Sequence, residues 1–311
     1  MSDTKTILLA AASTCILLAL APLASAADDV VTATPAPAAA ADAPAAPSWT
    51  GHIDLLSKYI LRGITSTYGP GAPGGNANAD APEASHGVVQ WGADWSEPSG
   101  FYLGYFGSTI NYSYLRLGQS YADRSITNFQ TSKSIENDLY GGYAGKVGEI
   151  GYTLGMTAYV YLNSKYSNAL ETKLGLSYGD FSATAQTLLQ DVVWGNKGDT
   201  YWALNYSKLL PYDVTLTGSL GYYTYTKQGK FLGTVDTLTG TACGAGASFA
   251  DNGCYAGKLP SSGGFRHLII GFTQPLGKAG ASWGLQEVIG GENRFGVQQK
   301  NQLVGSLTYG F

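Results

Sequence analysis

The sequence predicts an all-β protein, a transmembrane antiparallel up-and-down β-barrel of about 12 strands that ends on Phe311. Three observations predict this fold class. Apolar and polar residues alternate with period two in many segments of about ten residues. The links between these segments are alternately short and long. Charged residues make up only 13% of the 311 residues, whereas a soluble globular chain carries about 25%.

The N-terminal residues predict export. Lys5 precedes an apolar run over 7–23, and Ala24-Ser25-Ala26 supplies the small residues after which a signal peptidase cuts. We therefore expect a cleaved signal peptide at 1–26; an uncleaved membrane anchor is the alternative. The next stretch, 27–48, is rich in Ala and Pro and predicts a flexible leader. The barrel is then expected to occupy 49–311.

Twelve segments carry the period-two alternation, and the last of them carries it most clearly. There Leu303, Leu307 and Phe311 fall on one face, whereas Gln302 and Ser306 fall on the other. Several segments have ten or more residues, as a tilted membrane-spanning strand requires, whereas strands of soluble sheets average about 5 to 6. The twelve segments are 49–66, 87–96, 100–110, 134–145, 148–162, 168–179, 181–192, 199–209, 213–227, 265–275, 280–289 and 299–311.

The links between the segments predict which end of the barrel faces outward. Every second link is a short turn, and the three longest links all belong to the other set, which is the asymmetry of an outer-membrane barrel. Each unpaired backbone N–H or C=O costs several kcal/mol in hydrocarbon, so the sheet has to close. We therefore expect 299–311 to pair with 49–66, and Phe311 to lie in an aromatic girdle at the membrane interface.

Several motifs resemble a known family. SKYILRGI at 57–64, GFYLG at 100–104, DLYGGY at 138–143 and SLTYGF at 306–311 follow one another in the order that the TorF family of porins has. The resemblance covers roughly 49–311. The chain departs from the family at Lys58, where Asp or a similar polar residue is common, and in the stretch around Cys243 and Cys254. The resemblance implies a barrel in the outer membrane of a Gram-negative bacterium, and it implies no particular solute.

Polar residues on the inward face predict a solvated pore, because desolvating each ion would cost several kcal/mol. Acids exceed bases slightly on this face, which predicts a weak preference for cations. The alternative is that these charges pair across the lumen and plug it, with Leu56 and Ile60 in the plugged zone. The predicted pore-lining residues are His52, Asp54, Lys58, Arg62, Asp94, Glu136, Asp138, Glu171 and Lys173.

These observations favour an outer-membrane porin-like channel for passive diffusion of small hydrophilic solutes. Outer-membrane lipid and such solutes are then the expected partners, and a homo-oligomer is compatible with this class. The alternative function is a closed structural or surface-binding barrel without transport. The net charge of −4 and the absence of a basic stripe argue against binding of nucleic acid.

The remaining chemistry of the sequence is sparse. Cys243 and Cys254 form an even pair in an exported chain, which favours a disulfide over metal binding. No metal or cofactor is predicted. The chain has three His residues, and none has a Ser at a spacing that one strand would place beside it, so we expect no enzyme.

Overall fold

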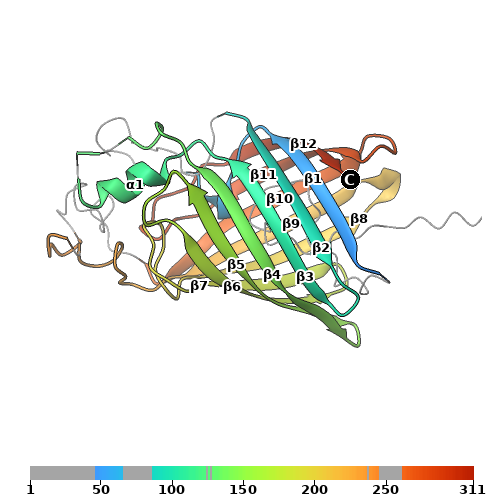
Figure 1. The fold of residues 1–311 in the computed structure, drawn as a ribbon, viewed down its shortest axis with the longest axis horizontal. Coiled ribbons are helices and arrows are strands. Elements are labelled where there is room, and N and C mark those ends of the chain that lie inside the picture. The colour runs from blue at the N-terminus through green and yellow to red at the C-terminus, as the bar shows by residue number, and fades with distance from the viewer. Residues whose placement is uncertain (1–45, 66–85, 124, 127, 237, 245–260) are drawn as a thin grey trace, which may run out of the picture.

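The computed structural model describes residues 46–65, 86–123, 125–126, 128–236, 238–244 and 261–311. Within them twelve strands form one closed antiparallel barrel, as the sequence predicts (Figure 1). The predicted signal peptide and most of the predicted leader lie outside the described residues. The elements are β1 (Ser48–Leu56), η1 (Leu61–Gly63), β2 (Val88–Ser96), β3 (Phe101–Thr109), α1 (Tyr114–Ser120), β4 (Ile135–Val147), β5 (Ile150–Leu162), β6 (Ala169–Tyr178), β7 (Phe181–Leu188), β8 (Thr200–Leu209), η2 (Pro211–Asp213), β9 (Thr215–Thr224), β10 (Gly263–Pro275), β11 (Ala281–Gly290) and β12 (Gln302–Gly310).

The barrel closes where its first strand meets its last. β1 pairs with β12 in antiparallel register from His52 opposite Gly310 to Leu56 opposite Ser306. The main chains of Gly51 and Phe311 exchange two further N–H···O hydrogen bonds of 2.8 and 2.9 Å. Every described strand therefore has a partner on both sides, and no strand edge is left to face hydrocarbon.

The outer face of the wall is apolar around the barrel. Leucine side chains on this face are exposed over fractions that run from 45% at Leu220 to 60% at Leu103. A soluble monomer rarely exposes so much contiguous apolar surface, because water penalises it, whereas lipid does not. The exterior therefore suits a bilayer. Further outward members of this belt are Leu139, Leu154, Leu174, Leu204, Ile270, Leu303 and Leu307.

Aromatic side chains gather at one end of the barrel, where the turns are short. They form cross-strand ring contacts, with centroids 6.5 Å apart for Trp49 and Trp95 and 5.0 Å apart for Phe181 and Tyr206. Phe311, 71% exposed, packs beside Tyr309 in the same zone. Amphipathic rings favour the membrane–water interface, so this ring of aromatics marks one boundary of the belt.

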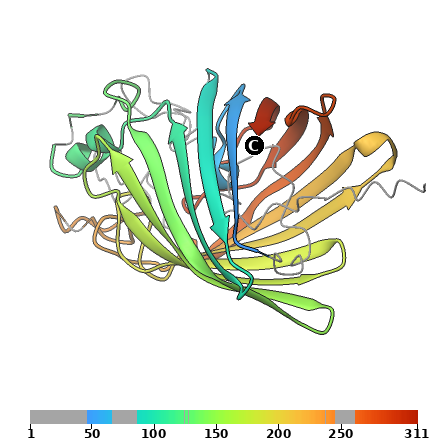
Figure 2. The same ribbon diagram turned by 45° about the vertical axis from the view of Figure 1, so that its right-hand side comes forward.

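The two ends of the barrel differ in their connections. The links 97–100, 148–149, 179–180, 210–214 and 276–280 lie at one end, whereas the other end carries the longer links and α1 (Figures 1 and 2). This is the asymmetry predicted from the sequence. None of the helices in the described ranges is long and apolar enough to cross a membrane.

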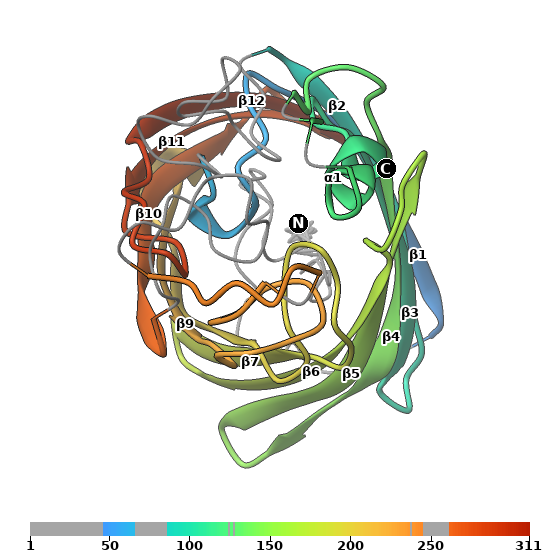
Figure 3. The ribbon, with the colours of Figure 1, turned by 90° about the vertical axis from the view of Figure 1, so that its left-hand side faces the viewer.

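The predicted strand 49–66 is wrong in its second half. β1 ends at Leu56, and residues 57–65 leave the wall and run into the lumen as an irregular segment with the short helix η1 (Figure 3). The apolar run Tyr59-Ile60-Leu61 interrupts the period-two alternation there, and Arg62 and Gly63 have φ angles of 47° and 70°, which no strand accommodates. We call residues 57–65 the inward segment.

The belt predicts a depth-dependent penalty for charge. Leu174→Arg, in the interior of β6 on the outer face, should lower the free energy of unfolding in lipid by about 2–4 kcal/mol, whereas Tyr178→Arg, on the same face at the short-turn end of β6, should cost at most about 1 kcal/mol. Urea titration in lipid vesicles measures both. Equal costs at the two positions would contradict a belt centred on the strands.

Candidate functional site

The inward segment is attached at both ends to the seam side of the barrel. At its start, the Ser57 amide donates to the Gly305 carbonyl at 2.9 Å, and Lys58 Nζ donates to Gln302 Oε1. At its end, the Thr65 amide donates to Gln299 Oε1 at 2.8 Å, and the Lys300 amide donates to Thr65 Oγ1 at 2.6 Å. Residues 299–305, which lead into and form β12, therefore hold the inward segment at both of its ends.

The middle of the segment packs tightly on β10. Gly63 has a left-handed φ of 70°, and a Cβ there would lie 2.6 Å from the Cβ of His267. Arg266 Nε donates to the carbonyl of Arg62 at 3.0 Å. Only glycine fits this conformation and this approach, so the sequence Arg62-Gly63 fixes where the segment turns.

The side chain of Arg62 connects the inward segment to the opposite wall of the barrel. Its guanidinium binds Glu171 on β6 through two hydrogen bonds of 2.7 and 3.0 Å, and both side chains are less than 5% exposed. β6 and β7 lie opposite the β1–β12 seam in the strand order. Further partners of the guanidinium come from four neighbouring strands and are Tyr159 on β5, Gln186 on β7, the ring of Tyr201 on β8 and Tyr223 on β9.

A second buried group lies beside this one. Tyr59 of the inward segment donates from its hydroxyl to Glu136 Oε2 at 2.6 Å, and Tyr161 donates to Glu136 Oε1 at 2.8 Å. Tyr59 is fully buried, and Asp138 is buried on the same strand. The Arg62 and Glu136 groups together place a layer of hydrogen-bonded polar side chains across the barrel. We call this layer the constriction.

Other predicted site residues lie on the inner wall away from the constriction. His52 Nδ1 and Asp54 Oδ2 are 2.6 Å apart on β1, and Asp94 accepts from the Tyr140 hydroxyl at 2.6 Å. Lys173 is buried on β6, two residues from Glu171. Of the nine predicted residues, Arg62 and Glu171 are joined directly across the lumen; Lys58 and Arg62 lie on the inward segment rather than in the wall.

Arginine residues that the sequence analysis did not select also face inward. β10 carries a bulge between Phe265 and His267, so Arg266 and His267 are consecutive and both buried. A bulge re-aims a side chain, and the preceding glycines 263 and 264 were the only sequence signal for it. Arg294 and Asp199 are in loops, where period-two parity assigns no direction.

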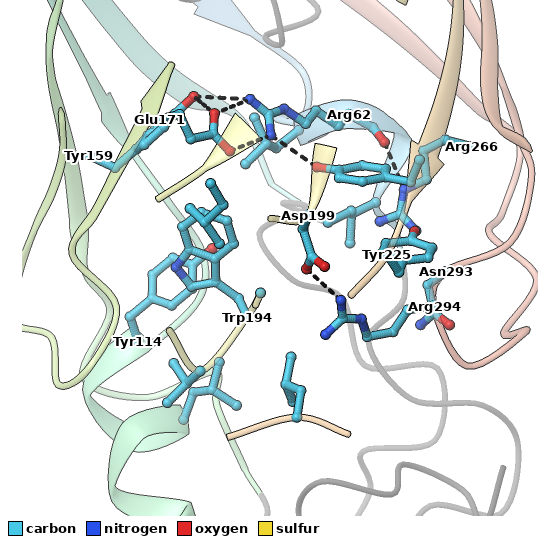
Figure 4. Close-up of a pocket in the computed structure, with 18 of the residues that line it drawn as sticks. Arg62, Tyr114, Tyr159, Glu171, Trp194, Asp199, Tyr225, Arg266, Asn293 and Arg294 are labelled. Atoms are coloured by element: carbon cyan, nitrogen blue, oxygen red, sulfur yellow. Dashed lines mark hydrogen bonds and ion pairs between the residues drawn. The ribbon is translucent and has the colours of Figure 1, made fainter. Parts of the chain in front are cut away.

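A cavity of about 120 Å³ lies between the constriction and the long loops (Figure 4). We call it the outer pocket. Arg294 Nη2 is ion-paired with Asp199 Oδ2 at its edge. Burial raises the pKa of the Asp199 carboxyl, although Arg294 and the amides of Asn196 and Thr226 favour its ionised form. Its lining residues include Leu61, Arg62, Ile64, Tyr114, Leu117, Tyr159, Glu171, Leu188, Val193, Trp194, Asp199, Tyr225, Leu232, Arg266, Arg294 and Phe295.

The structure describes one of the two cysteines of the predicted disulfide, and it also bears on metal binding. Within the described residues, no group of three or more His, Cys, Asp or Glu side chains could hold a metal ion. Cys243 is buried and disulfide-bonded, but Cys254 lies outside the described residues. The pairing of these two cysteines therefore stays a prediction.

Comparison with known proteins assigns the family. The model of a family described as "Bacterial protein of unknown function (Gcw_chp)" matches residues 38–257. The chain belongs to this Gcw_chp family. No curated protein matches the sequence.

Several solved structures of similar shape are distant in sequence. A KdgM porin matches with 8% identity and a TM-score of 0.42, over 84% of this chain and 98% of the porin. Outer membrane phospholipase A from Escherichia coli matches with 11% identity and a TM-score of 0.37, over 85% and 96%. Salmonella typhi OmpF in complex with daunomycin matches with 11% identity and a TM-score of 0.37, over 85% and 97%. None of these similarities assigns a function to this chain.

The buried ion pair predicts a strong coupling between its two partners. Arg62→Met leaves the Glu171 carboxylate buried without its cation, which should lower the free energy of unfolding by about 3–5 kcal/mol. The double variant Arg62→Met/Glu171→Met should cost less than either single variant. Urea titration of all three variants gives the coupling free energy.

The matched control is the exposed pair Lys208–Asp180, whose side chains are 51% and 42% exposed. Lys208→Met should cost at most about 1 kcal/mol, because water screens this pair. A cost for Arg62→Met as small as this would contradict a buried, strongly coupled Arg62–Glu171 pair.

Proposed function

We propose that this chain is a porin-like channel of the Gram-negative outer membrane, exported through its signal peptide, in which small hydrophilic solutes diffuse passively past the inward segment. The proposal rests on one observation: the exterior of the barrel is apolar, the interior carries polar side chains, and the inward segment narrows the lumen. Most strands carry buried polar side chains on the inner wall, among apolar ones such as Phe106, Val288 and Val304 that cluster with Tyr59 and Ile60 of the inward segment.

The inner wall towards the short turns supports passage of water and solutes. Many of its side chains are small, hydroxylated and partly accessible, so they offer hydrogen bonds without filling the lumen. The accessible inward positions there include Thr153, Gly175, Ser177, Thr217, Ser219, Ser306 and Thr308. Solutes that pass the constriction would enter this wider part.

The residues predicted from the sequence take distinct roles in this proposal. Arg62, Glu136 and Glu171 would set the narrowest cross-section, whereas His52, Asp54 and Asp94 would line the wider part. Arg266 and Arg294 add positive charge on the outer side. We therefore expect a smaller preference for cations than the excess of inward acids on the strands suggests.

The second candidate function is a closed structural or surface-binding barrel without transport. The completeness of the constriction favours it, because the Arg62–Glu171 pair and the Glu136–tyrosine group are buried and hydrogen-bonded. A channel of this design would have to open by movement of the inward segment, whereas a closed barrel would keep it fixed.

An enzymatic role is not part of the proposal. Within the described residues, His52 bonds to Asp54, His86 Nδ1 to the Asn111 side chain, and His267 Nε2 to the Tyr201 hydroxyl. None of these three contacts is to a serine, which an acyl-transfer triad would require. The proposed disulfide of Cys243 with Cys254 would stabilise a long outer loop and takes no part in transport.

Planar-bilayer recording of the purified protein tests the proposal. The wild type should give discrete conductance steps. Arg62→Ala/Glu171→Ala removes two large side chains from the constriction and should raise the single-channel conductance about twofold or more. Lys208→Ala, at an exposed site on the outer wall, should leave it unchanged.

One result of this recording would refute the channel proposal. If neither the wild type nor the Arg62→Ala/Glu171→Ala variant gives discrete steps, while both are folded and inserted, the channel proposal fails and the closed barrel takes its place.

A further inference from the structure

Three arginines of the outer pocket stack on tyrosine rings. The guanidinium carbon lies 4.7 Å from the ring centroid for Arg62 over Tyr201, 5.5 Å for Arg266 over Tyr223 and 4.9 Å for Arg294 over Tyr225. Tyr225 lies between Arg266 and Arg294 (Figure 4). Stacking holds each guanidinium plane in place and leaves its edge N–H groups to bind acceptors.

The pocket lining carries more positive than negative charge. Three guanidiniums, those of Arg62, Arg266 and Arg294, line it, against the two carboxylates of Glu171 and Asp199. Arg62 is neutralised by Glu171. Arg266 donates to the main-chain carbonyls of Arg62 and Glu292, which carry no formal charge. The excess positive charge therefore lies on the side of Arg266 and Arg294.

Arg294 has donor capacity left over. Its Nη2 is ion-paired with Asp199, but its Nη1 is buried and has no hydrogen-bond partner among the described residues. Arg294 as a whole is only 6% exposed. A buried donor of a charged group without an acceptor is costly, so this atom favours an anionic ligand that reaches it.

The rest of the lining is apolar and aromatic. Leu188, Val193, Leu232 and Phe295 form walls, together with Trp194, whose Nε1 is already bonded to the Ser167 carbonyl. A sugar would need many polar partners, which these walls do not offer. An apolar cavity of about 150 Å³ takes up benzene, so one of about 120 Å³ has the scale of a single ring.

We infer that the outer pocket binds a small aromatic carboxylate, with the carboxylate on Arg294 Nη1 and Arg266 and the ring between Trp194, Phe295 and the neighbouring aliphatic side chains. The inference rests on the proposed function and deepens it. The pocket lies on the loop side of the constriction, so it would collect the solute before the constriction admits it. Charge selects the acid, and the apolar walls select the ring.

Calorimetric titration of the full-length protein in detergent tests the inference with three probes. Benzoate carries both ring and charge, benzamide keeps the ring without the charge, and acetate keeps the charge without the ring. We expect saturable binding of benzoate, and binding at least about tenfold weaker for each of the other two, because each loses one of the two contacts. Equal affinity for benzoate and benzamide, or binding of glucuronate in preference to benzoate, would overturn the inference.

Two variants identify the site. Asp199→Asn/Arg294→Gln removes both charges of the pair without leaving either one buried alone, and it should weaken benzoate binding at least about tenfold. Arg116→Gln is the matched control, because Arg116 lies on α1 among the same long loops and is not part of the pocket lining. Unchanged benzoate affinity in the double variant would place any binding elsewhere and contradict the inference.

The titration needs no transport, so it separates this inference from the proposed function. Benzoate binding without conductance would refute the channel and leave the pocket, whereas conductance without benzoate binding would refute the pocket and leave the channel.

Discussion

The backbone hydrogen bonds between β1 and β12 are the constraint on which the rest of the structure depends. A sheet of this length with two open edges would expose rows of unpaired N–H and C=O groups to hydrocarbon. Pairing from Gly51–Phe311 to Leu56–Ser306 removes both edges at once. It also separates an apolar outer face that suits lipid from an inner face that carries the buried polar side chains of the strands.

The seam also determines where the lumen narrows. Gln299, which precedes β12, and Gly305, within β12, hold the inward segment at Thr65 and Ser57. From this attachment the Arg62 side chain reaches Glu171 on the far wall. The strand β12 therefore both closes the barrel and holds the segment that narrows the lumen. An open constriction would require these contacts to change while the seam itself stays paired.

The sequence was sufficient for the wall and insufficient for what lies inside it. A strand of a barrel in a bilayer has one face towards lipid and one face towards the lumen, so its residues alternate with period two. This alternation predicted the twelve strands. The prediction of a strand failed at residues 57–65, where the apolar run Tyr59-Ile60-Leu61 interrupts the alternation and the chain has left the sheet. The left-handed turn at Arg62 and Gly63 depends on contact with His267, which lies 204 residues from Gly63 and is not visible in local sequence.

The residues of the candidate site also fall into a set that the sequence predicted and a set that it missed. Glu136, Asp138, Glu171 and Lys173 were selected by parity and lie buried on the inner wall. Arg266 was missed because a bulge reverses its direction, and Arg294 and Asp199 were missed because loops have no parity. The outer pocket is built largely from such residues, so its chemistry could be recognised only from the folded chain.

Cysteine cross-linking across the seam tests the central claim most directly. Leu55 and Leu307 are opposite each other in the β1–β12 register, whereas Leu55 and Leu303 are not. Oxidation of the Leu55→Cys/Leu307→Cys variant in lipid should give an intramolecular disulfide, and the Leu55→Cys/Leu303→Cys variant should give none. Absence of the first cross-link, or equal formation of both, would contradict a closed barrel with this register.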